Sequence, residues 1–198
     1  VPASGSNLRG HFEDASDLLL SRAEEDSFEL AVLRAKLFTN QGRARDALEL
    51  LRAHEPDLAQ VPRQLGAEFL VELARAELRA GDYAACERAA GELTLLLSVV
   101  DDQEDLALLG SLAEGLALGG MAASFLGRVD ESAVRHDRSI ACARRVGASR
   151  VLSVALSSSA FSLQRAGKLA LAQAAYEEAL LHARRAGDAG TMATTRLN

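Results

Sequence analysis

A glycine-led pattern that recurs five times constrains this chain more than any other feature. Each occurrence reads Gly-x-(aromatic or aliphatic)-x-x-small, and the glycines are Gly10, Gly42, Gly81, Gly127 and Gly167. Glycine often ends a helix because it adopts the left-handed backbone conformation at little cost. The small residue five positions later lets the next helix pack closely against a neighbour. We therefore expect a turn followed by a helix at each glycine, at spacings of 32, 39, 46 and 40 residues.

The composition favours an all-α fold. Apolar residues make up 48% of the 198 residues and aromatic residues only 4%, and the chain has three Pro and no Trp. Ala and Leu therefore supply most of the apolar surface, and both are strong helix formers. Repeats of this length are typical of solenoids in which helical pairs stack on one another. We predict an all-α chain whose antiparallel helix pairs form an α-α superhelix.

Apolar residues at three- and four-residue spacing predict helices between these turns. The expected helices span residues 11–24, 27–40, 43–54, 64–80, 82–98, 103–126, 129–146, 149–166, 168–186 and 189–198. The connector between Pro56 and Pro62 separates two of them. The acidic run from Asp101 to Asp105 is expected at a helix start, where the helix dipole favours negative charge.

The stretch from Gly167 to Leu180 carries the most specific pattern. It reads Gly-x-Leu-x-x-Ala-x-x-x-Tyr-x-x-Ala-Leu, with the aromatic position at Tyr176. This order resembles the second helix of a tetratricopeptide repeat. Because most spacings exceed the 34 residues of the commonest unit, the chain is similar to the long-helix variants of bacterial signalling and transcription regulators. The resemblance implies that the first helix of each pair lines a concave face and the second covers the outside.

The resemblance implies a single array over residues 1–198. The expected units are a half-unit at 1–26, pairs at about 27–56, 62–98, 103–146 and 149–187, and a half-unit at 188–198. The last helix stops where the pattern that begins near Val151 would continue, so we expect a piece of a longer array. The surface for a next helix would then be exposed and apolar, and we expect self-association through this C-terminal end.

The resemblance also implies which side chains face a bound peptide. Glu29, Glu68 and Glu114 hold one inner-face position in three repeats, whereas basic and apolar residues hold others. The expected peptide-binding residues are Lys36, Asn40, Arg75, Arg79, Met121, Phe125, Phe161, Gln164 and Arg165. An acidic rim, a basic rim and an apolar floor would suit an acidic segment with a hydrophobic anchor.

An alternative is open for two of these arginines. Arg75 and Arg79 can pair with Glu72 and Glu68 on their own helix, which would stabilise it by a few tenths of a kcal/mol each. If instead both arginines face a peptide, reversing both charges is expected to abolish binding and leave the melting temperature nearly unchanged.

The implied function is a protein- or peptide-binding scaffold, the interaction region of a larger bacterial cytoplasmic regulator. The alternative is a sensory module that binds a small effector or signalling peptide and controls an attached catalytic or DNA-binding domain. The net charge of −6 argues against nucleic acid and anionic membranes as partners, because both attract a surplus of basic residues. Residues 106–126 are apolar and long enough to span a bilayer. However, Gly115-x-x-x-Gly119 and the fit to the repeat favour close helix packing instead.

No pattern predicts an enzyme, a cofactor or a metal site. Leu118-Gly-Gly-Met121 lacks the Lys-Ser/Thr of a phosphate-binding loop. The histidines, His11, His54, His136 and His182, have no ligand spacing. We expect His136 to be a hydrogen-bonded core residue, because it takes the place that Tyr176 has in the next repeat.

Serine and cysteine are expected to be structural as well. The serines between Ser153 and Ser162 have no Gly-x-Ser-x-Gly motif and are expected to line the concave face. Two cysteines without a C-x-x-C pair do not make a disulfide framework. Cys86 and Cys142 are therefore expected to be reduced, buried at helix contacts and unreactive.

Overall fold

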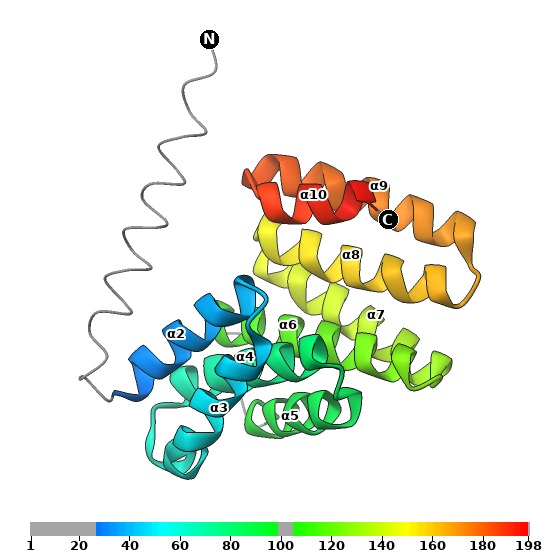
Figure 1. Ribbon diagram of the computed structural model, residues 1–198. Coiled ribbons are helices and arrows are strands. Elements are labelled where there is room, and N and C mark those ends of the chain that lie inside the picture. The colour runs from blue at the N-terminus through cyan, green and yellow to red at the C-terminus, as the bar shows by residue number, and fades with distance from the viewer. Residues whose placement is uncertain (1–26, 99–104, 198) are drawn as a thin grey trace.

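The computed structural model describes residues 27–98 and 105–197, and this part of the chain is helical without strands (Figure 1). The helices are α2 (Phe28–Asn40), α3 (Ala44–His54), the 3-10 helix η1 (Glu55–Gln60), α4 (Arg63–Ala80), α5 (Tyr83–Leu96), α6 (Leu106–Phe125), α7 (Val129–Val146), α8 (Ser149–Arg165), α9 (Leu169–Ala186) and α10 (Ala189–Leu197). The all-α prediction is confirmed, and each of these α-helices lies within three residues of its predicted bounds. The expected helix at 11–24 and the glycine turn at Gly10 lie outside the described residues.

Left-handed glycines end the helices as the sequence predicts. Positive φ angles occur, among the described residues, at Gly42, Gly81, Gly127, Gly147, Gly167 and Gly187. At Gly81, with φ of 86°, the chain turns so that its own N–H donates to the carbonyl of Leu78 at 3.2 Å. The N–H of Asp82 then donates to Glu77 O at 3.0 Å, and its carboxylate caps α5 by accepting from the N–H of Ala85.

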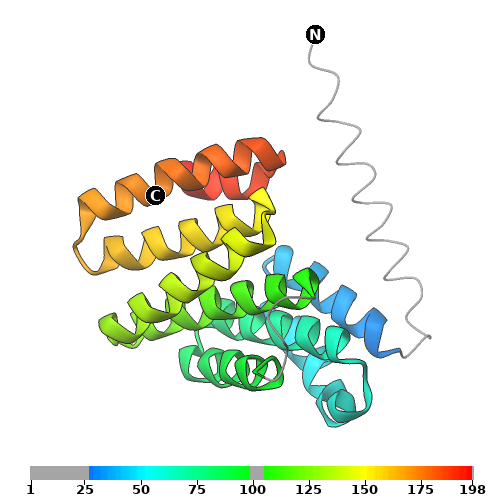
Figure 2. The ribbon, with the colours of Figure 1, turned by 180° about the vertical axis from the view of Figure 1, so that it is seen from behind.

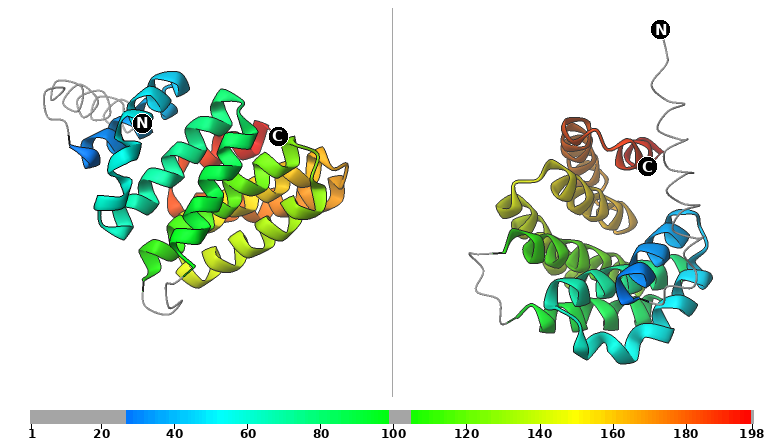
Figure 3. Two further views of the ribbon diagram at one scale, coloured as in Figure 1. Left: turned by 90° about the horizontal axis from the view of Figure 1, so that it is seen from below. Right: turned by 90° about the vertical axis from the view of Figure 1, so that its left-hand side faces the viewer.

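The helices form two rows. Each even-numbered helix, from α2 to α10, contacts the next even-numbered helix. The odd-numbered helices α3, α5, α7 and α9 pack on the even-numbered helices that precede and follow them in the chain. Figure 2 shows this order from behind, and Figure 3 shows it from below and from one side. We call the even-numbered helices the inner row and the odd-numbered helices the outer row.

Small residues after the glycine turns allow this close packing. The predicted small residues within the described range, Ala47, Cys86, Ser132 and Ala172, are all at most 3% exposed. Helix α6 uses glycine in the same way. A Cβ atom at Gly115 would overlap the Leu93 side chain of α5, and one at Gly119 would lie 3.1 Å from Ala90 Cβ. The close approach expected for this glycine pair is therefore confirmed.

Helix α6 is also the one described helix that is long and apolar enough to cross a membrane by length and composition. Within the molecule, 56% of its most apolar window is buried by neighbouring helices. Its first turn is capped by the carboxylate of Asp105, which accepts hydrogen bonds from the N–H groups of Ala107 and Leu108 at 3.0 and 3.1 Å. The other residues of the predicted acidic start, 101–104, lie outside the described residues.

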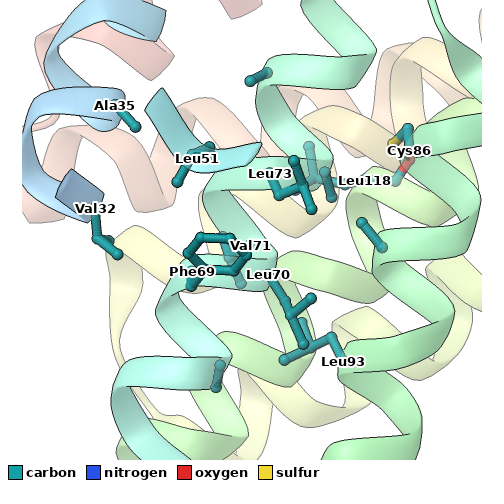
Figure 4. Packing of buried hydrophobic residues seen from close by; sticks show 14 of the residues in the cluster. Val32, Ala35, Leu51, Phe69, Leu70, Val71, Leu73, Cys86, Leu93 and Leu118 are labelled. Carbon is teal, nitrogen blue, oxygen red and sulfur yellow. Dashed lines mark hydrogen bonds between the residues drawn. The ribbon is translucent and has the colours of Figure 1, made fainter. Parts of the chain in front are cut away.

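The hydrophobic core divides into two clusters that meet at α6. The first centres on α4, where Phe69 and Leu70 pack with Leu51 of α3 and Leu93 of α5 (Figure 4). The second consists of small and aliphatic residues of α6 to α9, from Ala113 to Ala179. Because α6 contributes to both clusters, it joins the two halves of the inner row.

Candidate functional site

The inner row carries two adjoining cavities. The first, which we call the inner cavity, has a volume of about 570 Å³ and is lined chiefly by α4, α6 and α8, with the start of α10 at one side. The second, the side cavity, has about 400 Å³ and is lined chiefly by α2, α4, α6 and α8. Glu114 and Arg150 line both cavities, so the two share a wall.

The structure brings most of the sequence-predicted residues to this surface. Five of them line the inner cavity: Asn40, Arg75, Arg79, Met121 and Phe125. Lys36 lines the side cavity instead, and its side chain is exposed. Gln164 is exposed near the end of α8, where its side-chain oxygen accepts a hydrogen bond from the hydroxyl of Tyr176 at 3.1 Å. The nine predicted residues therefore spread over the inner row, and only five converge on one cavity.

A row of ion pairs lies along the wall shared by the inner and side cavities. Arg75 on α4 donates to Glu72 Oε1 at 2.9 Å and to Glu114 Oε2 on α6 at 2.6 Å. Arg150 on α8 lies 3.4 Å from the other oxygen of Glu114. Arg79, one turn after Arg75, is exposed and makes no ion pair with any other described residue. The alternative of pairing within the helix is therefore correct for Arg75, and Arg79 is left to face solvent.

Glu72 is an unusually buried member of this row. It is 4% exposed, and its Oε2 atom has no hydrogen-bond partner within the described part of the chain. Burial raises the pKa of the Glu72 carboxyl above its ordinary value, although the charges of Arg75 and Lys36 oppose this shift. The negative charge of Glu72 is therefore compensated mainly by the guanidinium of Arg75.

Aromatic residues close the other end of the inner cavity. The rings of Tyr83 and Phe125 stack with centroids 4.3 Å apart, and Phe161 lies 5.6 Å from Phe125. The guanidinium carbon of Arg165 is 4.3 Å from the centroid of the same Phe125 ring. Phe161 and Arg165 contact Phe125, which itself lines the cavity. Together these residues form an apolar edge with a positive charge above the Phe125 ring.

Two charged residues of this site were not predicted from the sequence. Arg150 pairs with Glu114, and Asp188 lines the inner cavity between α9 and α10. Asp188 caps α10, accepting hydrogen bonds from the Thr191 N–H at 3.0 Å and hydroxyl at 2.8 Å. Burial raises its pKa, but these hydrogen bonds and the charge of Arg150 outweigh burial and lower it. An Asp three residues before Thr at a helix start is a capping signal, yet the sequence does not reveal its proximity to Arg150.

His136 is the buried, hydrogen-bonded core residue that the sequence predicts. It is 2% exposed, and its Nε2 lies 2.8 Å from Ser162 Oγ on α8. Burial lowers the pKa of His136 to about 4. The ring packs against Gly120, where a Cβ atom would come within 2.7 Å of it. His136 therefore helps to hold α7 against α6 and α8.

The serines of α8 and the two cysteines differ in their surroundings. Of the α8 serines expected on the concave face, Ser157 and Ser158 line the inner cavity, whereas Ser159 and Ser162 line a cavity between α7 and α9. Cys86 is fully buried, and burial raises the pKa of its thiol to about 12. Cys142 is only half-buried on α7, so the expectation that both cysteines are buried is wrong for this one. It lies near the end of an outer helix, where less of the surface is covered.

The geometry is that of a binding surface with charges of both signs beside an apolar edge. Among the described residues, no group of three or more His, Cys, Asp or Glu side chains could hold a metal ion. The C-terminal helix α10 contacts α9, in which Ala179 is buried in the second core cluster while Leu169 and Leu171 are exposed. No protein-family model matches the chain, and no curated protein is significantly similar to it.

Proposed function

We propose that the chain is an α-α superhelix of the tetratricopeptide kind, with the inner row as its concave face. The support is the regular order of turns and helices and the continuous inner row from α2 to α10. The outer helices pack on this row through small residues at the positions that the family pattern requires.

We infer that the inner cavity binds a protein segment or peptide with acidic residues beside a hydrophobic anchor. The observation that carries this proposal is Arg79, an exposed cation that has no ion pair with a described residue at the edge of a cavity of about 570 Å³. Arg75 is held by Glu72 and Glu114, so Arg79 is the free partner for an acidic side chain. Met121 and Phe125 offer an apolar surface beside it for the anchor.

This role fits the interaction region of a larger bacterial cytoplasmic regulator. The proposal assigns binding and not catalysis, and it assigns neither nucleic acid nor a membrane as partner. Of the charges that line the inner cavity, Arg75, Arg79 and Arg150 exceed Glu114 and Asp188 by one. This local positive balance on a chain with a net charge of −6 favours an acidic partner over a basic one.

We expect the change Arg79→Glu to weaken peptide binding at least tenfold. The measurement is selection from a phage-displayed library of random short peptides, followed by affinity measurements on the selected sequences. A tenfold change corresponds to about 1.4 kcal/mol, which is reasonable for a lost charge pair replaced by repulsion. The selected peptides should be enriched in Asp and Glu next to aromatic or aliphatic residues.

The matched control is Arg88→Glu. Arg88 is likewise an exposed arginine, on outer helix α5, with no ion pair to another described residue. Its reversal changes the net charge by the same amount and should leave affinity within about twofold. Equal losses in both variants would mean that only net charge matters, and unchanged affinity in Arg79→Glu would move the site away from the inner cavity.

We also propose self-association through the open face of α9. A cavity of about 390 Å³ lies there between Leu169, Tyr176 and Leu180, and Leu169 is 65% exposed. The matching residues of α7, forty positions earlier, include Ser132 and His136, which are buried and hydrogen-bonded to α6 and α8. We expect Leu169→Glu to lower the average mass measured by light scattering at high protein concentration. An unchanged mass would show that this face does not associate.

A further inference from the structure

Successive intervals between the outer helices are filled to different degrees. Between α5 and α7, the guanidinium of Arg135 donates to Glu87 at 2.6 Å and to Glu131 at 2.5 Å. It also donates to the carbonyl of Gly119 at 2.9 Å, and Arg128 pairs with the other oxygen of Glu87. These contacts tie α5 and α7 to each other and to α6.

The interval between α7 and α9 lacks such a filling. It contains a cavity of about 540 Å³, which lies within the range of about 300–1,000 Å³ that is usual for sites of small molecules. Helix α8 forms its floor, and α7 and α9 form its walls. Arg144 pairs with Glu178 across it at 3.4 Å, and both side chains are exposed. We call this space the outer cavity.

The floor of the outer cavity presents the hydroxyl group of Ser159. Ser159 on α8 is 8% exposed, and its side chain makes no hydrogen bond with any other described residue. The other serines on this helix face differ, since Ser162 is paired with His136. The hydroxyl is not closed off from solvent, so it opens onto the cavity and is available to bond an occupant.

The rest of the lining is mixed at depth, where Ser132, His136 and Ser162 are also buried, and the charges at the rim sum to zero. Leu156, Ile140 and Leu163 are buried or half-buried and face the cavity with several alanines. The charged lining residues are two basic and two acidic: Arg144, Lys168, Asp137 and Glu178. An ion inside would meet no net opposite charge to compensate its lost hydration.

We propose that the outer cavity is a second binding site, separate from the inner cavity, for a small uncharged molecule with an apolar body and a hydrogen-bonding group. The group bonds to Ser159, and the body packs between α7 and α9. Ser157 and Ser158 of the same helix line the inner cavity, so α8 is a wall of both sites. The site does not depend on peptide binding at the inner cavity.

The test uses the 198-residue chain and the dye N-phenyl-1-naphthylamine, which is uncharged, largely apolar and carries one N–H group. Its fluorescence should rise saturably with a stoichiometry of one. The change Ala175→Phe fills the cavity from α9 and should weaken dye binding at least tenfold. Ala174→Phe is the matched control, because Ala174 is the adjacent exposed residue and does not line the cavity. It should leave dye binding within twofold.

A second pair of variants tests the hydroxyl without adding bulk. Ser159→Ala should weaken dye binding about fivefold, whereas Ser158→Ala, at a neighbouring serine that lines the inner cavity, should not. The anionic dye 8-anilinonaphthalene-1-sulfonate should bind at least tenfold more weakly. Absence of saturable binding, equal effects of Ala175→Phe and Ala174→Phe, or equal affinity for both dyes would each overturn the proposal.

Discussion

Replacing Arg75 by Glu should destabilise the protein by about 3 kcal/mol or more, because a third carboxylate would then lie beside Glu72 and Glu114. The side chain of Glu72 is only 6% exposed and that of Glu114 only 16% exposed, so water solvates their negative charges poorly. For a chain of this length, this corresponds to a fall in the melting temperature of about 10 °C. Thermal unfolding followed by circular dichroism measures it.

The neighbouring change Arg79→Glu should alter stability by no more than about 0.5 kcal/mol, because this side chain is exposed and has no ion pair with a described residue. Combining Arg75→Glu with Glu114→Arg restores opposite charges across α4 and α6 and should recover part of the loss. An unchanged melting temperature in Arg75→Glu would show that these ion pairs contribute nothing to the stability of the fold. Binding is accordingly tested with Arg79 alone, since reversing both arginines would also destabilise the fold.

Stability should also fall by about 3 kcal/mol as the pH falls from about 6.5 to about 4, through the protonation of His136. Burial lowers the pKa of this imidazole from 6.5 to about 4, and each pH unit corresponds to about 1.36 kcal/mol. In this window the unfolded chain binds a proton that the folded protein does not. The contribution is therefore fully present above about pH 6.5 and lost below about pH 4.

The variant His136→Gln removes the titrating group and should flatten the pH dependence over this window. Urea unfolding of both proteins at several pH values gives the difference, which isolates His136 from groups common to both. Glu72 acts in the opposite sense, because its raised pKa makes the folded protein bind the proton more readily. Parallel curves for the two proteins would show that the imidazole is protonated, or solvated, in the folded state.

The helices and turns were predictable because they depend on signals close together in the chain. A left-handed glycine such as Gly81 and the apolar spacing of the following residues act within one or two helical turns. The burial of His136 was predictable from its place in the repeat. The 3-10 helix after α3 was not predicted, because the connector between Pro56 and Pro62 has no helical periodicity.

The charged site was only partly predictable. The sequence places Arg75 and Glu72 on one helix, three residues apart, so their pairing was among the expected alternatives. Glu114 is 39 residues from Arg75, and their contact depends on how α4 and α6 cross. The same holds for Arg150 and Asp188, and for the outer cavity, whose walls come from three helices. Periodicity identifies the face of a helix but not the side chains that the facing helix presents.

The glycines of α6 have a consequence for how the molecule folds. Each glycine within a helix lowers its intrinsic stability by about 1 kcal/mol relative to alanine, and α6 contains Gly110, Gly115, Gly119 and Gly120. An isolated α6 would therefore be a poor helix, and it becomes ordered mainly by docking against α5 and α7. Since the same helix joins both hydrophobic clusters, the residues that permit close packing also couple the two ends of the chain into one cooperative transition.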